Sequence, residues 1–99
     1  MRLLAFAGST RIGAYNQRLL DLAVGLAREA GAEVTAISLR DYPMPLYDGD
    51  LEANDFPAVA DAFRTLMIEH DGFLIASPEY NGSVSGVLKN AIDWASRPP

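Results

Sequence analysis

GFLIASPEYNGSVSGVLKNAIDW, residues 72–94, changes its pattern of apolar residues twice. Gly72 to Ala76 is a continuous apolar run, which predicts a strand buried on both faces of a parallel sheet. From about Ser85 apolar residues recur at three- and four-residue spacing, which predicts a helix packed on that sheet. The side chains expected to point inward from this helix are Val87, Leu88, Ala91, Ile92 and Ala95. A strand, a polar loop and a helix in this order predict a parallel α/β unit.

The N-terminal part of the chain repeats this order of a strand followed by a helix. Leu3 to Ala7 is a second continuous apolar run and predicts another buried strand. Residues 16–30 predict a helix with Asn16 as its N-cap and Gly31 just after its end. The apolar residues expected to face the sheet are Leu19, Leu22, Ala23, Leu26, Ala27 and Ala30.

The middle of the chain predicts a third such unit that contains a long loop. Residues 33–39 predict a less buried strand, and residues 40–56 predict a loop of a length typical of functional or mobile segments. Pro57 predicts the start of a helix that runs to about His70. The side chains expected on its inner side are Val59, Phe63, Leu66 and Met67.

The order of elements predicts a three-layer α/β/α sandwich with a parallel sheet and right-handed crossovers. The first and third strands are the most apolar, so we place them side by side, with the second strand outside the first. Strand order 2-1-3 is the first half of the flavodoxin-like arrangement. Ligands in such sheets bind beyond the carboxyl ends of the strands where the winding reverses. We therefore expect residues 8–15 and 77–83, the loops after strands one and three, to be neighbours.

Composition narrows the classes of function. A chain of 99 residues predicts one domain, and a net charge of −5 argues against general nucleic-acid binding. There is no cysteine, which excludes disulfides and thiolate chemistry. Asp41, Asp48 and Asp50 lack EF-hand spacing, so no metal site is predicted. No signal peptide or membrane span is recognisable, and the expected location is cytoplasmic.

The first loop, GSTRIGAYN (residues 8–16), has the residues of an anion site. Its two glycines permit close backbone approach, and Arg11 supplies a planar cation suited to phosphate. Free N–H groups at the start of the following helix favour the same ligand. The alternative is an ordinary turn with a helix cap and a solvent-facing arginine. Neither the Walker pattern nor the dinucleotide-binding pattern of glycines occurs.

The second loop has a different character. Pro78 is rigid, Tyr80 is a flat aromatic, and Gly82 permits close backbone approach. Such a loop is suited to line one side of a planar heterocycle. The alternative is a connecting turn in which Tyr80 packs on the domain and Glu79 is solvated.

GSTRIGAYN together with SPEYNGSVSGVLKNAIDWASRP resembles the NADPH-dependent FMN reductase family, which includes quinone, chromate and azo-dye reductases. The resemblance covers the whole chain and includes LRDYPMPLYDGDLE (residues 39–52). It implies that the first loop holds the FMN phosphate and that the second lies along the ribityl chain and the isoalloxazine edge. The cofactor-binding residues implied are Ser9, Arg11, Gly13, Tyr15, Asn16, Pro78, Glu79, Tyr80, Asn81 and Gly82.

The resemblance implies a reaction in which NAD(P)H reduces FMN, and FMN then reduces a quinone, azo compound or chromate. No catalytic side chain is required, because the cofactor carries the chemistry. The resemblance also implies a homodimer or homotetramer. The family pattern extends beyond Pro99 with further strands, so the expected fold is its N-terminal portion with the third strand open at one edge. A flavodoxin-type electron carrier and a truncated inactive chain stay as alternatives.

Three further features are expected to be structural. His70 is placed at a helix C-terminus, where it interacts with the helix dipole. Asp93, Trp94 and Arg97 are expected to serve packing or a subunit contact. Residues 44–47 are expected to help build the pocket or an interface.

Overall fold

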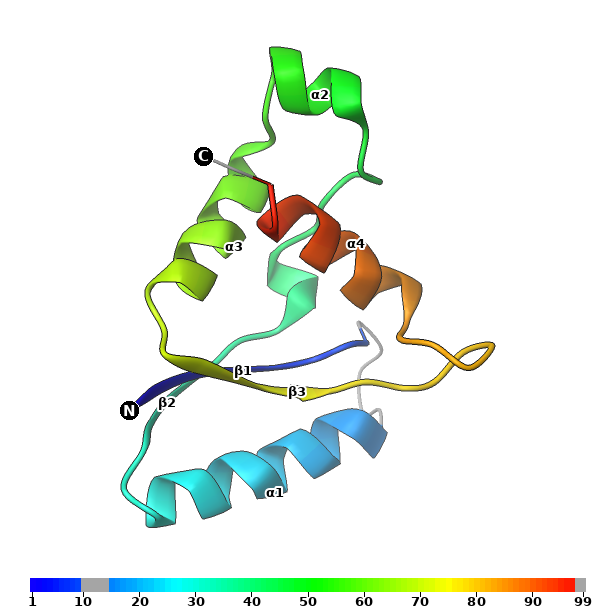
Figure 1. Cartoon of the computed structure of the whole chain (residues 1–99). Helices are drawn as coiled ribbons and strands as arrows, with labels where there is room; N and C mark the ends of the chain where they lie inside the picture. The colour runs from blue at the N-terminus through cyan, green and yellow to red at the C-terminus, as the bar shows by residue number, and fades with distance from the viewer. Residues whose placement is uncertain (10–14, 98–99) are drawn as a thin grey trace.

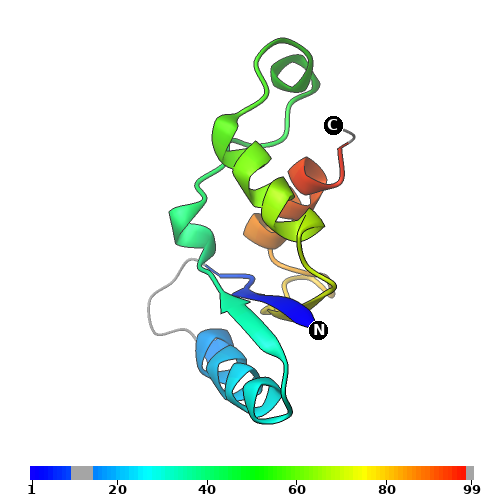
Figure 2. The same cartoon turned by 90° about the vertical axis from the view of Figure 1, so that its left-hand side faces the viewer.

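A three-stranded parallel sheet forms the middle layer of the molecule, in the order β2-β1-β3. The computed structural model describes residues 1–9 and 15–97. Its strands are β1 (Arg2–Ala7), β2 (Glu33–Ala36) and β3 (Gly72–Ala76). Helix α1 (Tyr15–Glu29) covers one face, and α3 (Ala58–Ile68) and α4 (Gly86–Ala95) cover the other (Figures 1 and 2). The predicted strand order and three-layer architecture are confirmed.

The alternation of side chains along β1 builds a core on each face of the sheet. Leu4 and Phe6 point to the α3 and α4 side, where the Phe6 and Phe63 rings meet edge to face with centroids 5.4 Å apart. Ala5 and Ala7 point to the other side and contact Leu20 of α1. The continuous apolar run of β1 predicted a central strand, and its burial on both faces agrees with that prediction.

Helix α1 faces the sheet with a different side from the predicted one. Leu20 and Val24 are its buried residues, while Leu19, Leu22 and Leu26 are about 60% exposed. On the same side of the helix, Arg28 donates from Nη2 to the carbonyl oxygen of Val34 in β2, at 2.9 Å. At 100° per residue, the three exposed leucines lie on the opposite flank of α1, away from β2.

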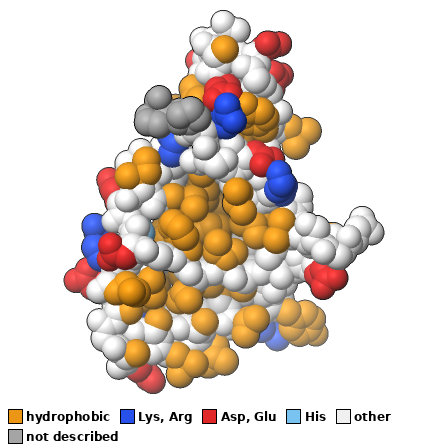
Figure 3. All heavy atoms as spheres, viewed as in Figure 1, with side chains coloured by type: hydrophobic (Ala, Val, Ile, Leu, Met, Phe, Trp, Pro, Cys, Tyr) orange, Lys and Arg blue, Asp and Glu red, His pale blue; other side chains and the backbone are white. Residues whose placement is uncertain are grey.

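The other edge of the sheet is more open than the apolar run in β3 suggests, and the prediction that residues 72–76 are buried on both faces was wrong. Phe73 and Ile75 are 43% and 41% exposed, because in the described part of the chain β3 has a neighbouring strand on one side only. Val84, Val87 and Ile92 are also exposed, which corrects the prediction that Val87 and Ile92 point inward. Figure 3 shows hydrophobic side chains gathered in the middle of this face. The expected open edge is confirmed.

The segment between β2 and α3 is more structured than a loop. Strand β2 ends at Ala36, earlier than predicted, and the 3-10 helix η1 (Leu39–Asp41) follows it. A short helix, α2 (Gly49–Asn54), begins after Asp48, whose side chain accepts a hydrogen bond from the Asp50 N–H. Helix α2 lies apart from the sheet (Figures 1 and 2). The prediction of an unbroken loop over residues 40–56 was therefore wrong.

Helices α3 and α4 mostly follow the expected pattern. Phe63 is buried, and Leu66 and Met67 pack against the core, as predicted. His70 donates from Nδ1 to the Leu66 carbonyl oxygen at 2.6 Å, which confirms its structural role at the end of α3. Trp94 is fully buried in α4, which confirms a packing role for that residue. No helix in residues 1–9 and 15–97 has the length and apolar character needed to cross a membrane.

Candidate functional site

The loops after β1 and β3 meet at the carboxyl edge of the sheet. Gly8 donates from its N–H to the Ala76 carbonyl oxygen at 2.6 Å and accepts a hydrogen bond at its own oxygen from the Ser85 hydroxyl. A Cβ at Gly8 would lie 2.7 Å from Ser77 Oγ and 2.9 Å from Ser77 Cβ. The prediction that the two loops are neighbours is confirmed, and their contact leaves room only for glycine.

Residues 80–83 form a tight hairpin turn. Tyr80 and Ser83 exchange backbone hydrogen bonds of 2.9 and 3.0 Å. The two residues between them have positive φ, 52° at Asn81 and 76° at Gly82, as a type I′ turn requires. Asn-Gly is the preferred pair for that turn, so local geometry accounts for both residues.

The second loop presents most of its side chains to solvent. Tyr80 is 58% exposed, so the alternative in which it packs on the domain is excluded, and Glu79 is exposed. A hollow of about 440 Å³ opens beside the loop. It is lined by Ser77, Pro78, Glu79, Gly82, Ser83 and Val84. Of the residues predicted in this loop, Tyr80 and Asn81 do not line it.

The first loop is described only at its two ends. Ser9 is half-buried directly after Gly8. Tyr15 is 85% exposed and begins α1, so Asn16 lies in the first turn rather than at the N-cap. The N-terminal end of α1 lies on the same side of the molecule as the hairpin turn (Figure 1). Predicted site residues Arg11 and Gly13 lie outside the described residues.

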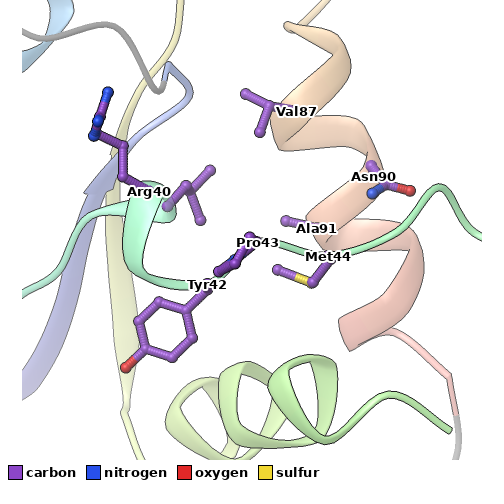
Figure 4. Close-up of a pocket in the computed structure, with 8 residues that line it drawn as sticks. Arg40, Tyr42, Pro43, Met44, Val87, Asn90 and Ala91 are labelled. Carbon is purple, nitrogen blue, oxygen red and sulfur yellow. The ribbon is translucent and has the colours of Figure 1, made fainter.

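A second cavity, of about 290 Å³, lies between the segment after β2 and helix α4. Figure 4 shows Tyr42, Pro43 and Met44 on one side of it, and Val87 and Ala91 on the other. Leu39, Arg40 and Asn90 complete its lining. Met44 fits the expectation that residues 44–47 help build a pocket. The contribution of α4 to this cavity was not predicted. Asn90, a polar residue on an otherwise apolar helix face, was the available signal.

Helix α4 holds the segment that forms the outer side of this cavity. Asn90 donates from Nδ2 to the Pro45 carbonyl oxygen at 2.9 Å and accepts from the Tyr47 N–H at 2.8 Å. Trp94 donates from Nε1 to the same Pro45 oxygen at 2.8 Å, and its ring meets the Tyr47 ring edge to face. These contacts fix the position of the segment without any ligand.

A charged cluster of Tyr47, Glu52 and Arg97 fastens α2 to the end of α4. The Tyr47 hydroxyl donates to Glu52 Oε1, and Arg97 donates from Nε to Glu52 Oε2 at 2.7 Å. The bond from Arg97, followed by the bond from Tyr47, lowers the pKa of Glu52 below its usual 4.5. The bond to Glu52, followed by desolvation, raises the pKa of Tyr47 above its usual 10.0.

These shifts predict that the cluster weakens at both ends of the pH range. A lowered Glu52 pKa stabilises the fold above about pH 4.5, and that contribution is lost as pH falls through the folded-state pKa. A raised Tyr47 pKa stabilises the fold below pH 10, and that contribution is lost as pH rises beyond that value. Trp94 fluorescence, measured against pH, is expected to change at both limits.

Glu52→Gln separates this cluster from the other carboxylates. We expect this variant to lose the acid-side change in Trp94 fluorescence. Asp61→Asn is the matched control, because Asp61 pairs with Arg64 on α3 at 2.6 Å and is not part of the cluster. An acid-side change that persists in Glu52→Gln would contradict the assignment.

In the part of the chain that the structure describes, no three His, Asp or Glu side chains gather as a metal site would require. Trp94 contributes packing, as the sequence suggested, while Arg97 forms an ion pair with Glu52 that was not predicted.

The sequence profile of the NADPH-dependent FMN reductase family matches residues 1–99. An NAD(P)H:quinone oxidoreductase of Solanum tuberosum is 45% identical over all of this chain and 52% of its own length. An NAD(P)H-dependent FMN reductase of Pseudomonas aeruginosa is also 45% identical, again over all of this chain and 52% of its own. The chain thus spans about half the length of the curated relatives it matches.

Solved structures show the same fold. FerB, a flavoenzyme NAD(P)H:(acceptor) oxidoreductase from Paracoccus denitrificans, superposes with a TM-score of 0.80 and 32% identity. The match covers 98% of this chain and 51% of FerB. An azoreductase from Bacillus anthracis superposes with a TM-score of 0.78 over 99% of this chain and 56% of its own, at 20% identity, which supports the fold alone.

Proposed function

Because the chain belongs to the NADPH-dependent FMN reductase family, we propose that it acts in the NAD(P)H-dependent reduction, through FMN, of an acceptor such as a quinone, azo compound or chromate. The observation that carries this proposal is the contact of the two loops at Gly8, where the winding of the sheet reverses. FMN has an anionic phosphate at one end and a planar ring system at the other. The first loop has the residues of an anion site, and the second loop is suited to line a planar ring.

The chain's residues suit the two ends of FMN. In this proposal Ser9, Arg11 and Asn16 hold the phosphate with the backbone at Gly13 and Tyr15. Exposed backbone and side chains of the second loop flank the ring, and the hollow beside Pro78 and Glu79 gives it room. The residues assigned to the ring side are Pro78, Glu79, Tyr80, Asn81 and Gly82.

Bound FMN supplies hydride chemistry, and the protein orients it and controls access. The two backbone bonds of the turn join Tyr80 and Ser83, and in this proposal the Asn81 and Gly82 N–H groups donate to acceptor atoms on the ring. A hydrogen bond from the Ser85 hydroxyl to the Gly8 carbonyl oxygen links the loop after β1 to the start of α4. No side chain is assigned as a catalytic acid or base.

Purified protein tests the proposal directly. It should take up FMN, and NADPH should bleach the flavin absorbance, which a quinone should then restore. Failure to take up FMN would contradict the cofactor assignment and favour an inactive chain. Uptake without bleaching by NADPH would favour an electron carrier.

Arg11→Ala is expected to raise the FMN dissociation constant by about tenfold to a hundredfold, because a charge-assisted hydrogen bond to the phosphate is lost. Arg11→Lys should recover part of this loss, since it keeps the charge but not the planar fork. Fluorescence titration with FMN measures both. Lys89→Ala is the control, because Lys89 pairs with Asp93 on α4. Unchanged affinity in Arg11→Ala would exclude Arg11 from the phosphate site.

A cytoplasmic location and a homodimer or homotetramer complete the proposal, with residues 1–99 forming one FMN-binding unit. The exposed flank of α1, with Leu19, Leu22 and Leu26, supports association, because monomers rarely expose large contiguous apolar patches. Sedimentation at several protein concentrations tests it. A monomer at every concentration would contradict this part of the proposal.

A further inference from the structure

Ser85 is the most buried polar residue among the described residues, with 2% of its surface exposed. Its hydroxyl donates to the Gly8 carbonyl oxygen and accepts from the Leu88 N–H at 3.3 Å. A hydroxyl has one proton to donate, and here that proton is committed to the loop after β1. Its acceptor capacity serves the first turn of α4. One buried side chain therefore holds two segments that are 77 residues apart.

A short series of hydrogen bonds continues from Ser85 into the second loop. The Ser85 N–H donates to Ser77 Oγ at 3.4 Å, and the Ser77 hydroxyl donates to the Pro78 carbonyl oxygen at 2.9 Å. Gly8 is also held from the other side, because its N–H donates to Ala76. The start of the first loop and the start of the second loop are thus fixed to each other through Ser85 and Ser77.

We propose that Ser85 is a positioning residue that sets the distance between the phosphate-binding loop and the ring-binding loop. This inference rests on the proposed function. FMN must contact both loops at once, so the spacing between them decides whether its phosphate and its ring can bind together. Ser85 acts through Gly8 and Pro78 and does not touch the cofactor.

A simple helix cap is the competing explanation for Ser85, and the two roles use different atoms. Capping needs only an acceptor for the Leu88 N–H, and aspartate is as good a cap as serine. Holding Gly8 needs a donor, which a carboxylate lacks. Ser85→Asp therefore keeps the cap and removes the link, Ser85→Ala removes both, and Ser85→Thr keeps both.

Riboflavin gives a readout that general destabilisation would not move. It carries the same ring as FMN but has no phosphate, so it depends on the second loop alone. We expect Ser85→Ala and Ser85→Asp to reduce the preference for FMN over riboflavin by about tenfold, corresponding to one lost hydrogen bond. Ser85→Thr should keep the preference of the wild-type protein. Ser38→Ala is the control, because Ser38 caps η1 by accepting from the Arg40 N–H at 3.2 Å.

Fluorescence titrations of the full chain with both flavins decide the matter. If Ser85→Asp and Ser85→Ala keep the wild-type preference for FMN, the inference is wrong. If wild-type protein binds neither flavin, the proposed function fails, and hydrogen exchange at the Gly8 amide still tests the link. The Gly8 amide is bonded to the Ala76 oxygen and exchanges when the two loops separate, so its exchange should be faster in Ser85→Asp than in Ser85→Thr. Equal exchange would overturn the claim that Ser85 joins the loops.

Discussion

Replacing Trp94 by alanine is expected to lower the free energy of unfolding by about 3–5 kcal/mol. The indole is fully buried, and its ring meets the Tyr47 and Phe56 rings edge to face, with centroids 4.9 and 5.3 Å away. Its N–H also holds Pro45. A loss of this size is a large share of the total stability of a small domain. Urea denaturation followed by circular dichroism measures it.

Trp94→Phe separates packing from the hydrogen bond. It keeps an aromatic ring and loses the N–H, while Asn90 still donates to the Pro45 oxygen. The expected loss is about 1 kcal/mol for the hydrogen bond, with a further cost for the smaller ring. If Trp94→Ala costs no more than Trp94→Phe, the aromatic cluster does not hold the segment after β2 on α4.

Gly8→Ala is expected to weaken FMN binding by more than tenfold and to lower stability by about 1–3 kcal/mol. The added methyl would lie 2.9 Å from Ser77 Cβ and 3.1 Å from Ser85 Oγ. Ser77 Cβ cannot rotate away, so one loop must move from the other. Calorimetric titration with FMN and thermal unfolding measure the two effects.

Gly25→Ala is the matched control for this substitution. Gly25 lies inside α1, and apart from its own stretch of helix no heavy atom lies within 4 Å of the position that its Cβ would take. Alanine should stabilise this helix by about 0.5–1 kcal/mol and leave FMN binding unchanged. Equal FMN affinity in Gly8→Ala and Gly25→Ala would show that the contact at Gly8 does not shape the site.

Most of the fold was predicted from sequence patterns that are compatible with only one kind of structure. The apolar runs at Leu3–Ala7 and Gly72–Ala76 are too short for helices of the usual length and are bounded by loop residues, so they identified two strands. Because these two strands are the most apolar, they were placed side by side. The same reasoning brought the two loops together before any contact was known, and the hydrogen bonds of Gly8 agree with it.

The buried side of α1 was predicted wrongly because its sequence has two apolar stripes, and either could face the sheet. Helix α1 has one apolar stripe at Leu20 and Val24 and another at Leu19, Leu22 and Leu26. Their spacing is helical in both cases, and contacts with the sheet select between them: Leu20 and Val24 pack with Ala5 and Ala7, and Arg28 bonds to β2. Tertiary contacts therefore decide which side of α1 faces the sheet, and a local sequence pattern carries no information about them.

Helix α2 and the cavity beside α4 depend on residues far apart in the sequence. Six residues make too short a helix to be stable alone, and α2 relies on Tyr47, Glu52 and Arg97. The cavity requires Asn90 to hold a segment 45 residues earlier. The Asp48 cap and Asn90 are local signals, but neither shows which distant segment α2 or α4 contacts.

Because β3 is an open edge of the sheet, ionic strength is expected to affect the association of copies of the protein in solution. Two copies could pair along this strand, because an unpaired strand edge offers a row of backbone donors and acceptors. A net charge of −5 on each copy opposes that approach. The range of this repulsion falls from about 30 Å at 0.01 M salt to about 10 Å at 0.1 M. Pairing of copies along β3 is therefore expected to increase as the salt concentration rises.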